Sequence, residues 1–427
     1  MDVGKIVKQQ LESIGLDEKS DVVVAVSGGV DSLALWHMLV QGAGRWRGRV
    51  WGVHVLHLWP TDEDEVPIFL EEMGARWSVP LAILSFDAPA RAAERGESLE
   101  EASRHGRYNL LARYAQEKQA AAVITAHHAD DQAETVLMHL IRGAGLNGLA
   151  GMRPKGVVPC EDELDIMLAR PLLTVPKAAL RAYCDDYELK PLEDEMNQDV
   201  RFRRNRIRHQ LLPLLADYNP EISRLLGQTA TIVAADVAWL EAETAAAWLG
   251  WVQAKGAGWV RWSRAEWCEA PLALRRRSLR YGWEQVAAGG ELAFKAVELA
   301  RSVAERGQVG GEVDLGAGVQ LRVEYESLLL LRSDVEIGYD GPQLVTAVAQ
   351  LLGVPGELRL AGGWRLEAKW ALAEAALVND DDPFVAWLAL APDEQLLVRG
   401  RRAGERMRPL GMGGQRVRLK KVMGELR

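Results

Sequence analysis

The first 150 residues alternate between short apolar runs and longer amphipathic stretches. Runs rich in aliphatic residues predict strands over residues 22–26, 50–55, 81–86 and 121–125. Helical spacing of apolar residues predicts helices over residues 33–40, 68–76, 99–120 and 133–142. Because strands alternate with helices, this pattern predicts a doubly wound α/β fold, with a parallel sheet covered on both faces.

The pattern changes after residue 215. An alanine-rich helical stretch covers about 218–248, two further helical patterns cover 272–281 and 292–301, and short strands with many turns cover 310–331. We therefore expect a catalytic domain over residues 1–215 and a smaller domain, helical with short strands, over 216–332. Residues 333–395 are expected to be a linker or the start of a C-terminal domain, and 396–427 a partial, basic C-terminal module.

Composition narrows the class of protein. The 427 residues, 48% apolar and 26% charged, are typical of a soluble protein with two or three domains. No apolar stretch reaches the roughly 18 residues that a membrane span needs, and the N-terminus lacks a signal-peptide core. Cys160, Cys184 and Cys268 form no CxxC pair, so neither a zinc knuckle nor a cysteine-held cluster is favoured. We expect a cytoplasmic protein without a membrane partner.

The charge is unevenly distributed. The net charge is −9, yet residues 399–427 carry ten Lys or Arg and two acids. Further basic clusters lie at 201–208 and 275–280. Basic patches on an acidic body fit local contact with RNA, although each cluster alone could equally be a solvated face or a set of salt-bridge partners.

The strand at 22–26 leads directly into Ser27-Gly28-Gly29-Val30-Asp31-Ser32. A strand, a glycine turn and a helix start aim backbone N–H groups and a helix dipole at one point, which suits phosphate. No Lys follows the glycines, so this is not the GxxxxGK[ST] loop. Asp31 would repel phosphate unless a cation lies between them, which suggests Mg²⁺. The alternative is an ordinary glycine-rich turn with a capping serine.

A second polar segment follows the strand at 121–125 and contains His127, His128, Asp130, Asp131 and Glu134. On a continuous helix, His127, Asp131 and Glu134 would share one face. Since ligands of such sheets bind at the carboxyl ends of strands, we expect this segment and the Ser27 loop to meet in one crevice. Acids of a first helical turn also complement the helix dipole, and a transition-metal site is a further alternative.

The hexapeptide at 27–32 resembles the pyrophosphate loop of the N-type ATP pyrophosphatases, the PP-loop superfamily. Other segments narrow this resemblance to the tRNA(Ile)-lysidine synthetase family. They are residues 98–108, 125–152, 170–173, 193–213 and 399–412. The resemblance implies a PP-loop catalytic domain followed by tRNA-binding parts.

The reaction that the resemblance implies has two steps and uses ATP and Mg²⁺. The C2 oxygen of the wobble cytidine in the CAU anticodon of tRNA(Ile) is adenylated, with release of pyrophosphate. Free lysine then attacks C2 through its ε-amine and AMP leaves. The chain would thus be an AMP-forming C–N ligase acting on tRNA.

The resemblance also implies roles for individual residues. The ATP-binding candidates are Ser27, Gly28, Gly29, Val30, Asp31, Ser32 and His54, with Asp31 as the Mg²⁺ ligand. The catalytic candidates are Asp31, His128, Asp130, Asp131, Glu134, Arg107 and Arg204. Arg107 and Arg204 would stabilise charge at the α-phosphate. Asp131, Glu134 or His128 would accept the lysine proton or hold its ammonium groups. The tRNA-binding candidates are Arg203, Arg206, Arg208, Arg276, Arg401, Arg402, Arg406, Lys420 and Lys421.

The chain departs from the family pattern in two places. After the second strand the family usually has a His-Val-Asn-His-Gly-Leu-Arg-like run, where this chain has His54-Val-Leu-His-Leu-Trp-Pro60. We therefore expect altered ATP recognition there. The C-terminal module is expected to be incomplete, because the sequence ends at Arg427.

Other functions stay open at this point. One is another PP-loop enzyme that modifies tRNA, such as a thiolase, although the cysteine spacing offers no catalytic pair. A small-molecule ligase of the same fold and a degenerate homologue that binds ATP or tRNA without turnover are further alternatives. The sequence also leaves open whether the chain forms a homodimer.

Overall fold

The structure is a computed structural model of the whole chain. It describes residues 2–41, 46–58, 65–162, 164–192, 203–287, 289–290, 292–324, 326–335, 337, 344–346, 348–371, 385–388, 390–391, 395–400, 405–407 and 417–418. The chain divides into two compact units, residues 1–253 with 262–281 and residues 254–261 with 282–427. Each unit is described by itself.

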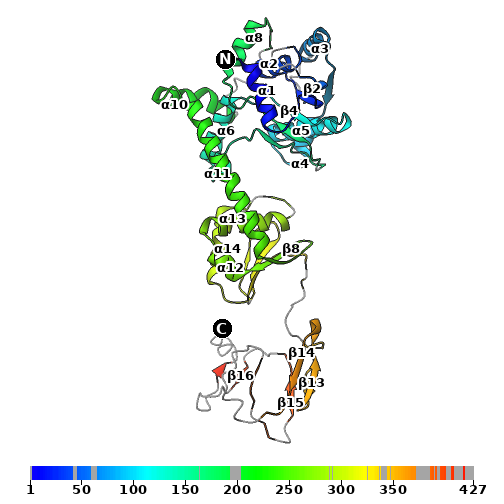
Figure 1. Cartoon of the computed structure of the whole chain (residues 1–427), viewed down its shortest axis with the longest axis vertical. Helices are drawn as coiled ribbons and strands as arrows, with labels where there is room; N and C mark the ends of the chain where they lie inside the picture. Colours follow the sequence, from blue (N-terminus) through cyan, green and yellow to red (C-terminus); the bar gives the residue numbers. More distant parts are fainter. Residues whose placement is uncertain are drawn as a thin grey trace. The chain divides into compact units, whose positions relative to one another are not determined.

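The first unit contains a six-stranded sheet in the order β3-β2-β1-β4-β6-β5. Its strands β2 and β4 are labelled in Figure 1. Its strands are β1 (Val22–Ala25), β2 (Val50–Leu56), β3 (Leu81–Ser85), β4 (Ala122–Ile124), β5 (Lys155–Val157) and β6 (Met167–Ala169). All neighbouring pairs are parallel except β5 and β6. The carboxyl ends of β1, β2, β4 and β6 therefore meet at one edge, where the chain turns toward the candidate site.

Helices connect and cover these strands. The first five are α1 (Val3–Ser13), α2 (Val30–Val40), α3 (Glu65–Trp77), α4 (Ala88–Arg95) and α5 (Leu99–Glu117). The next are α6 (Ala129–Arg142), α7 (Leu146–Leu149), α8 (Lys177–Asp186), α9 (Arg203–Arg206), a π-helical turn (Ile207–Leu211), α10 (Leu212–Tyr218) and α11 (Ile222–Trp251). The unit also holds α12 (Arg264–Glu269) and the start of α13 (Leu272–Val286).

Alternate residues of the strands face two separate cores. Val22 and Val24 of β1 pack with α1, α2 and α8, whereas Val23 packs with Tyr108 and Leu111 of α5. All five side chains are at most 1% exposed, and burying an aliphatic side chain contributes about 1.5–3 kcal/mol. This alternation explains why the strand reads as a continuous apolar run: both faces of the sheet are covered.

The expected α/β fold with an N-terminal parallel sheet is confirmed, with differences at element ends. Helix α2 begins at Val30 rather than 33, and α6 begins at Ala129 rather than 133. Helix α1, the edge strand β5 and its neighbour β6 were not predicted from the sequence. Strand β5, with only three residues and an antiparallel partner, makes the sheet mixed at this edge.

The second unit is built mainly from antiparallel strands. A five-stranded sheet has the order β7-β8-β11-β10-β9, and α14 (Phe294–Arg306) belongs to this unit. The strands are β7 (Val252–Gly256), β8 (Trp259–Ser263), β9 (Glu312–Asp314), β10 (Val319–Val323) and β11 (Ser327–Arg332). The short strands expected over 310–331 are present, as is the helix expected near 292–301.

Three two-stranded sheets complete the described part of this unit. They pair β12 (Gln350–Leu352) with β15 (Leu396–Val398), β13 (Gly356–Arg359) with β14 (Arg365–Ala368), and β16 (Arg406–Met407) with β17 (Val417–Arg418). A 3₁₀ turn (Ala361–Gly363) lies between β13 and β14. Within the ranges that the structure describes, no helix has the length and apolarity needed to cross a membrane.

Candidate active site

The loop between β1 and α2 is braced by one hydroxyl group. The Ser32 Oγ accepts a hydrogen bond from the Ser27 backbone N at 3.0 Å and donates one to the Gly29 carbonyl at 3.2 Å. It also lies 3.1 Å from the Ser27 Oγ. Gly28 has a φ of +83°, a conformation that glycine adopts without strain. The loop is therefore held in shape from inside, which leaves its outer side to a ligand.

The loop also presents the start of α2. Gly29 is the N-cap of this helix and provides no capping side chain. The N–H groups of a first helical turn have no partner within the helix, so they can bind an anion. A Cβ on Gly29 would meet only the Ser27 Oγ, at 3.7 Å. The open space at Gly29 is consistent with close approach of a phosphate group.

Asp31 lies in the first turn of α2 and faces the second polar segment. Its Oδ2 is 3.4 Å from the His128 Nε2. Its Oδ1 is buried and has no hydrogen-bond partner in the described part of the chain. A buried carboxylate oxygen without a partner is costly in free energy unless a ligand satisfies it. The residue fits Mg²⁺ bound jointly with phosphate oxygens, because this hard cation prefers carboxylate and phosphate ligands.

His128 is the N-cap of α6 and lies among three carboxylates. Its ring nitrogens are 3.4 to 3.5 Å from Asp31, Asp130 and Asp131, and the residue is 2% exposed. Burial favours the neutral ring, but hydrogen bonds to Asp130 and Asp31 and the charge of Asp131 outweigh it and raise the pKa of His128 to about 9. The Nδ1 atom also lies 3.2 Å from the Asp130 amide N, a cap bond that only the neutral ring accepts. We favour the charged ring, because three carboxylates surround it.

His127 differs from its neighbour. It precedes α6, so the expectation that it shares a helical face with Asp131 and Glu134 is wrong. Its Nδ1 lies 2.9 Å from the Thr125 hydroxyl. Burial lowers the pKa of His127, and the charges of Arg170 and Arg204 lower it further. The charge of Asp131 acts in the opposite direction. The two adjacent histidines are thus one neutral and one charged.

Asp130 binds the backbone of a neighbouring helix. Its Oδ2 accepts a hydrogen bond from the Lys177 backbone N at 2.8 Å, which ties α6 to the start of α8. Hydrogen bonding to His128 holds the pKa of Asp130 below its ordinary value, against partial burial. Asp130 therefore supports His128 and the helix start.

Asp131 and Glu134 bind two arginines. Arg204 donates from Nε to Glu134 Oε2 at 2.7 Å and from Nη2 to Asp131 Oδ1 at 2.8 Å. Arg208 donates from Nε to Glu134 Oε1 at 2.5 Å and from Nη2 to Asp131 Oδ1 and Glu134 Oε2 at 3.2 and 3.1 Å. The Glu134 side chain is fully buried. We call these four residues the charge cluster.

A group of cations lies near His127. Arg107 and Arg170, like Arg204, act electrostatically on His127. Burial lowers the pKa of both Arg107 and Arg170, and nearby Arg104 lowers them further, although Tyr108 opposes this. Neither Arg107 nor Arg170 has a carboxylate partner among the described residues. Like charges gathered without acids are a favourable place for an anion.

Sequence reasoning did not place Arg170 among the site residues. Its Nη1 donates to the Arg153 carbonyl at 2.9 Å, and its Nε is buried without a partner within the described ranges. The available signal was its position directly after β6, at the same sheet edge as the Ser27 loop.

The His54 ring contacts the residue that precedes the Ser27 loop. Its Nδ1 is 2.8 Å from the Val26 carbonyl, so the ring donates from this nitrogen. The side chain is 9% exposed. Trp59 and Pro60 belong to the segment that departs from the family pattern, and they lie outside the described residues.

The tRNA-binding candidates are scattered. Arg203 and Arg206 are exposed on α9, Arg276 is half-buried on α13, and Arg406 is exposed on β16. Arg208 points into the charge cluster instead, where its side chain is 24% exposed. Arg401, Arg402, Lys420 and Lys421 lie outside the described residues.

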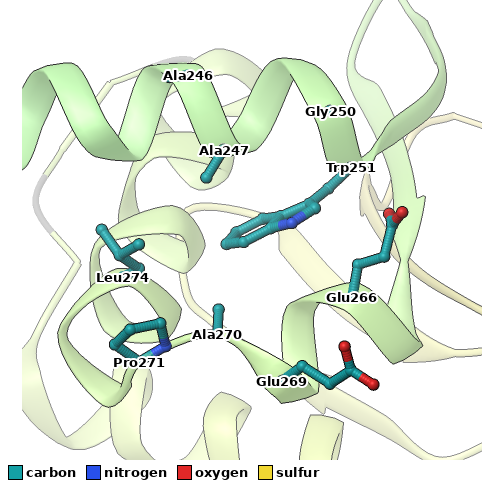
Figure 2. Close-up of a pocket in the computed structure, with 9 residues that line it drawn as sticks. All are labelled: Ala246, Ala247, Gly250, Trp251, Glu266, Glu269, Ala270, Pro271 and Leu274. Carbon is teal, nitrogen blue, oxygen red and sulfur yellow. The ribbon is translucent and has the colours of Figure 1, made fainter.

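Two observations concern other kinds of site. Within the described ranges, no group of three or more His, Cys, Asp or Glu side chains is arranged to hold a metal ion by itself. A surface groove of about 470 Å³ lies at the end of α11, where the indole of Trp251 forms the floor and Glu266 and Glu269 line one side (Figure 2). None of the candidate site residues lines this groove.

Comparisons with known proteins agree with this geometry. Residues 3–215 match the model of the PP-loop domain family. The chain is 33% identical over 416 residues to a tRNA(Ile)-lysidine synthase of Geobacillus kaustophilus, covering 96% of this chain and 86% of that protein. It is 34% identical over 425 residues to the synthase of Symbiobacterium thermophilum, with the same coverage.

Among solved structures, a U34-tRNA thiolase of Methanococcus maripaludis has a TM-score of 0.43 and 17% identity. The match covers 54% of this chain and 77% of the thiolase chain.

Proposed function

The chain belongs to the tRNA(Ile)-lysidine synthase family of PP-loop ATP-using ligases, and from this premise we propose how its residues act on ATP, tRNA(Ile) and lysine. The activity is ATP-dependent modification of tRNA. The substrates are the wobble cytidine of the CAU anticodon and free lysine, with adenylation at C2 before the ε-amine attacks.

The loop at Ser27–Ser32 binds the β- and γ-phosphates through the backbone N–H groups of its turn and of the first turn of α2. The brace by Ser32 keeps these donors in place before the ligand arrives. Preorganised donors cost no rearrangement during the reaction. His54 borders the same pocket from the end of β2 and fixes its ring on Val26.

Asp31 would hold Mg²⁺ between itself and the phosphates. The partnerless Oδ1 of Asp31 supports this assignment. When bound, Mg²⁺ neutralises charge on the pyrophosphate leaving group. The charged ring of His128 lies on the other oxygen of Asp31 and fixes the carboxylate in position.

Arg107 and Arg204 would stabilise the α-phosphate during adenylation. Arg107 has no carboxylate partner in the described part of the chain, so its charge is available to an anion. Arg170 is a third candidate for this role, on the same grounds. Arginine suits this task because its planar fork binds phosphate oxygens in pairs.

Lysine must lose a proton before it attacks, because an ammonium group is not a nucleophile. Asp131 and Glu134, which bind Arg204, would hold the ε-ammonium and take up its proton. The charged ring of His128 does not accept a proton, which makes it a positioning residue in this scheme.

The arrangement of domains is part of the proposal. We propose that residues 1–215 carry the chemistry, that 216–332 and the basic module at 396–427 contact tRNA, and that 333–395 connect them. Segregated positive charge on the module, within an acidic chain, supports an RNA contact there.

The observation that carries the proposal is the juxtaposition of the braced phosphate loop, the partnerless Asp31 oxygen and the unbalanced arginines. The test is pyrophosphate release from ATP and Mg²⁺, with and without tRNA(Ile) and lysine. We expect release that requires this tRNA, with lysine incorporated into it. ATP binding without release under any of these conditions would instead identify a degenerate binding protein.

A further inference from the structure

The charge cluster has no net charge. Two carboxylates, Asp131 and Glu134, balance two guanidinium groups, Arg204 and Arg208. Both oxygens of Glu134 and the Oδ1 of Asp131 accept from arginine, and the Asp131 Oδ2 accepts from the His128 backbone N at 3.0 Å. Every carboxylate oxygen of the cluster is thus already engaged.

Such a cluster offers a lysine ammonium group neither an unbalanced negative charge nor a free hydrogen-bond acceptor. Moving a cation to a buried place is costly unless an unbalanced negative charge and free acceptors await it. Glu134 is fully buried, so water does not compensate for a missing partner. As it stands, the cluster disfavours the second substrate of the proposed reaction.

The two arginines are held differently. Arg208 follows Ile207, which is buried together with Leu212 against Ala133 and Leu137 of α6. Arg204 lies in the four-residue helix α9, and its charge acts on both Arg107 and His127. Apolar neighbours thus hold Arg208 close to the acids, whereas Arg204 binds the acids and also acts electrostatically on Arg107.

We propose that Arg204 exchanges partners during the reaction. An anion bound by Arg107, the α-phosphate of the nucleotide under the proposed function on which this inference rests, draws Arg204 away from Asp131 and Glu134. The acids then keep Arg208 alone, with a net charge of −1. One lysine ε-ammonium balances that charge and takes the place that the Arg204 guanidinium has left.

The exchange couples the two substrates. If nucleotide binding frees the acids, then lysine binding must favour nucleotide by the same factor, because coupling of binding free energies is reciprocal. The arrangement also keeps lysine away from the acids until a nucleotide phosphate is bound.

The test measures lysine binding by equilibrium dialysis of radiolabelled lysine against the full chain. It is run with and without saturating Mg²⁺ and α,β-methylene ATP, which is not cleaved at the α–β bond. We expect lysine to bind about tenfold more tightly with the nucleotide analogue, a typical coupling. Equal affinity in both conditions would overturn the proposal without the need for any variant.

Arg204→Gln tests the residue itself. This variant keeps Arg208 on the acids but has the net charge of −1 permanently, so we expect lysine to bind as tightly without the analogue as with it. Arg224→Gln is the matched control, because Arg224 forms an exposed pair with Glu221 on α11. It should keep the wild-type coupling. A thermal melt of each variant confirms that it is folded.

Failure of this inference is distinguishable from failure of the proposed function. Lysine incorporation into tRNA(Ile) by a wild-type protein that shows no coupling would overturn the exchange and leave the function standing. Coupling that persists in Arg204→Gln would also overturn it. No incorporation and no lysine binding under any condition would contradict both.

Discussion

At the scale of single residues, the site depends on charges that are matched in pairs. His128 is held by Asp31, Asp130 and Asp131, and Glu134 by two arginines. Such residues affect stability and activity together. Single substitutions can separate the effect on stability from the effect on activity, because only some of these charge pairs face a proposed ligand.

Replacing Asp31 tests the cation site. We expect Asp31→Asn to lower pyrophosphate release by about a hundredfold or more, the size of effect seen when one preorganised electrostatic group is removed. The melting temperature should also fall, because the neutral amide no longer pairs with the charged His128 ring, so ATP binding and folding are measured separately. Asp217→Asn, at an exposed position of α10, is the control. Unchanged release in the Asp31 variant would contradict the assignment.

The raised pKa of His128 predicts a pH dependence of stability. Because its folded pKa of about 9 exceeds the ordinary 6.5, the charged ring stabilises the fold fully below pH 6.5 and progressively less up to about pH 9. The contribution at low pH is on the order of 3 kcal/mol. Urea unfolding of wild type and His128→Gln at several pH values measures it. The difference between them should shrink as pH rises; a constant difference would show a ring that does not titrate in this range.

The control for this measurement is His105→Gln. His105 is exposed and pairs with Glu97 on the surface. Its replacement should leave the pH dependence of unfolding close to that of wild type.

At the scale of elements, the phosphate loop is the part whose backbone matters most. Gly28 has a positive φ, and a Cβ there would lie 3.3 Å from Val66. We expect Gly28→Ala to cost about 1–2 kcal/mol of stability, the penalty of a left-handed conformation for an L-residue. ATP affinity should fall as well, because the loop would move.

Gly29→Ala should separate these effects. Its backbone is extended, with φ −75° and ψ 166°, and its Cβ would meet no close neighbour. We expect near-normal urea unfolding but weakened ATP binding, because the methyl group would occupy the outer side of the loop. A Gly29 variant that binds ATP normally would place the phosphates elsewhere.

The sequence predicted some of the helices and strands and not others, for identifiable physical reasons. The strands of the parallel sheet were found because both faces are buried and the runs are continuously apolar. The three-residue strands β5 and β6 were missed because so short a run carries no periodicity. The helical position of His127 was wrong because a capping box makes His128 the N-cap, so that α6 starts at Ala129.

The candidate site was predictable in part. Strand ends located the Ser27 loop and the His127 segment correctly at one edge, and His128 joins them by its contact with Asp31. The pairing of Arg208 with Glu134 was not predictable, because those residues are 74 positions apart and only the fold brings them together. Charge spacing alone favoured an exposed RNA contact for Arg208.

At the scale of the whole molecule, the uneven charge predicts how tRNA binding responds to salt. Each phosphate contact contributes about 0.7–0.9 to the slope of log K against log salt. Replacing Arg401 and Arg402 by Gln should therefore reduce the slope by about 1.5, while ATP binding stays the same. Filter binding at several salt concentrations measures this. An unchanged slope would remove these two residues from the tRNA interface.

The π-helical turn at Ile207–Leu211 bears on which insertions and deletions the chain can tolerate in evolution. A π turn closes one residue later than an α turn, so it is the usual trace of a single inserted residue. Loss of one residue here would let the turn close as an ordinary α turn and would leave the following helix in nearly the same orientation. Leu212 would then keep its place in the apolar cluster with Ala133 and Leu137. The turn is thus a place where this chain can shorten by one residue, whereas the side chains of Ile207 and Arg208 are held by their contacts.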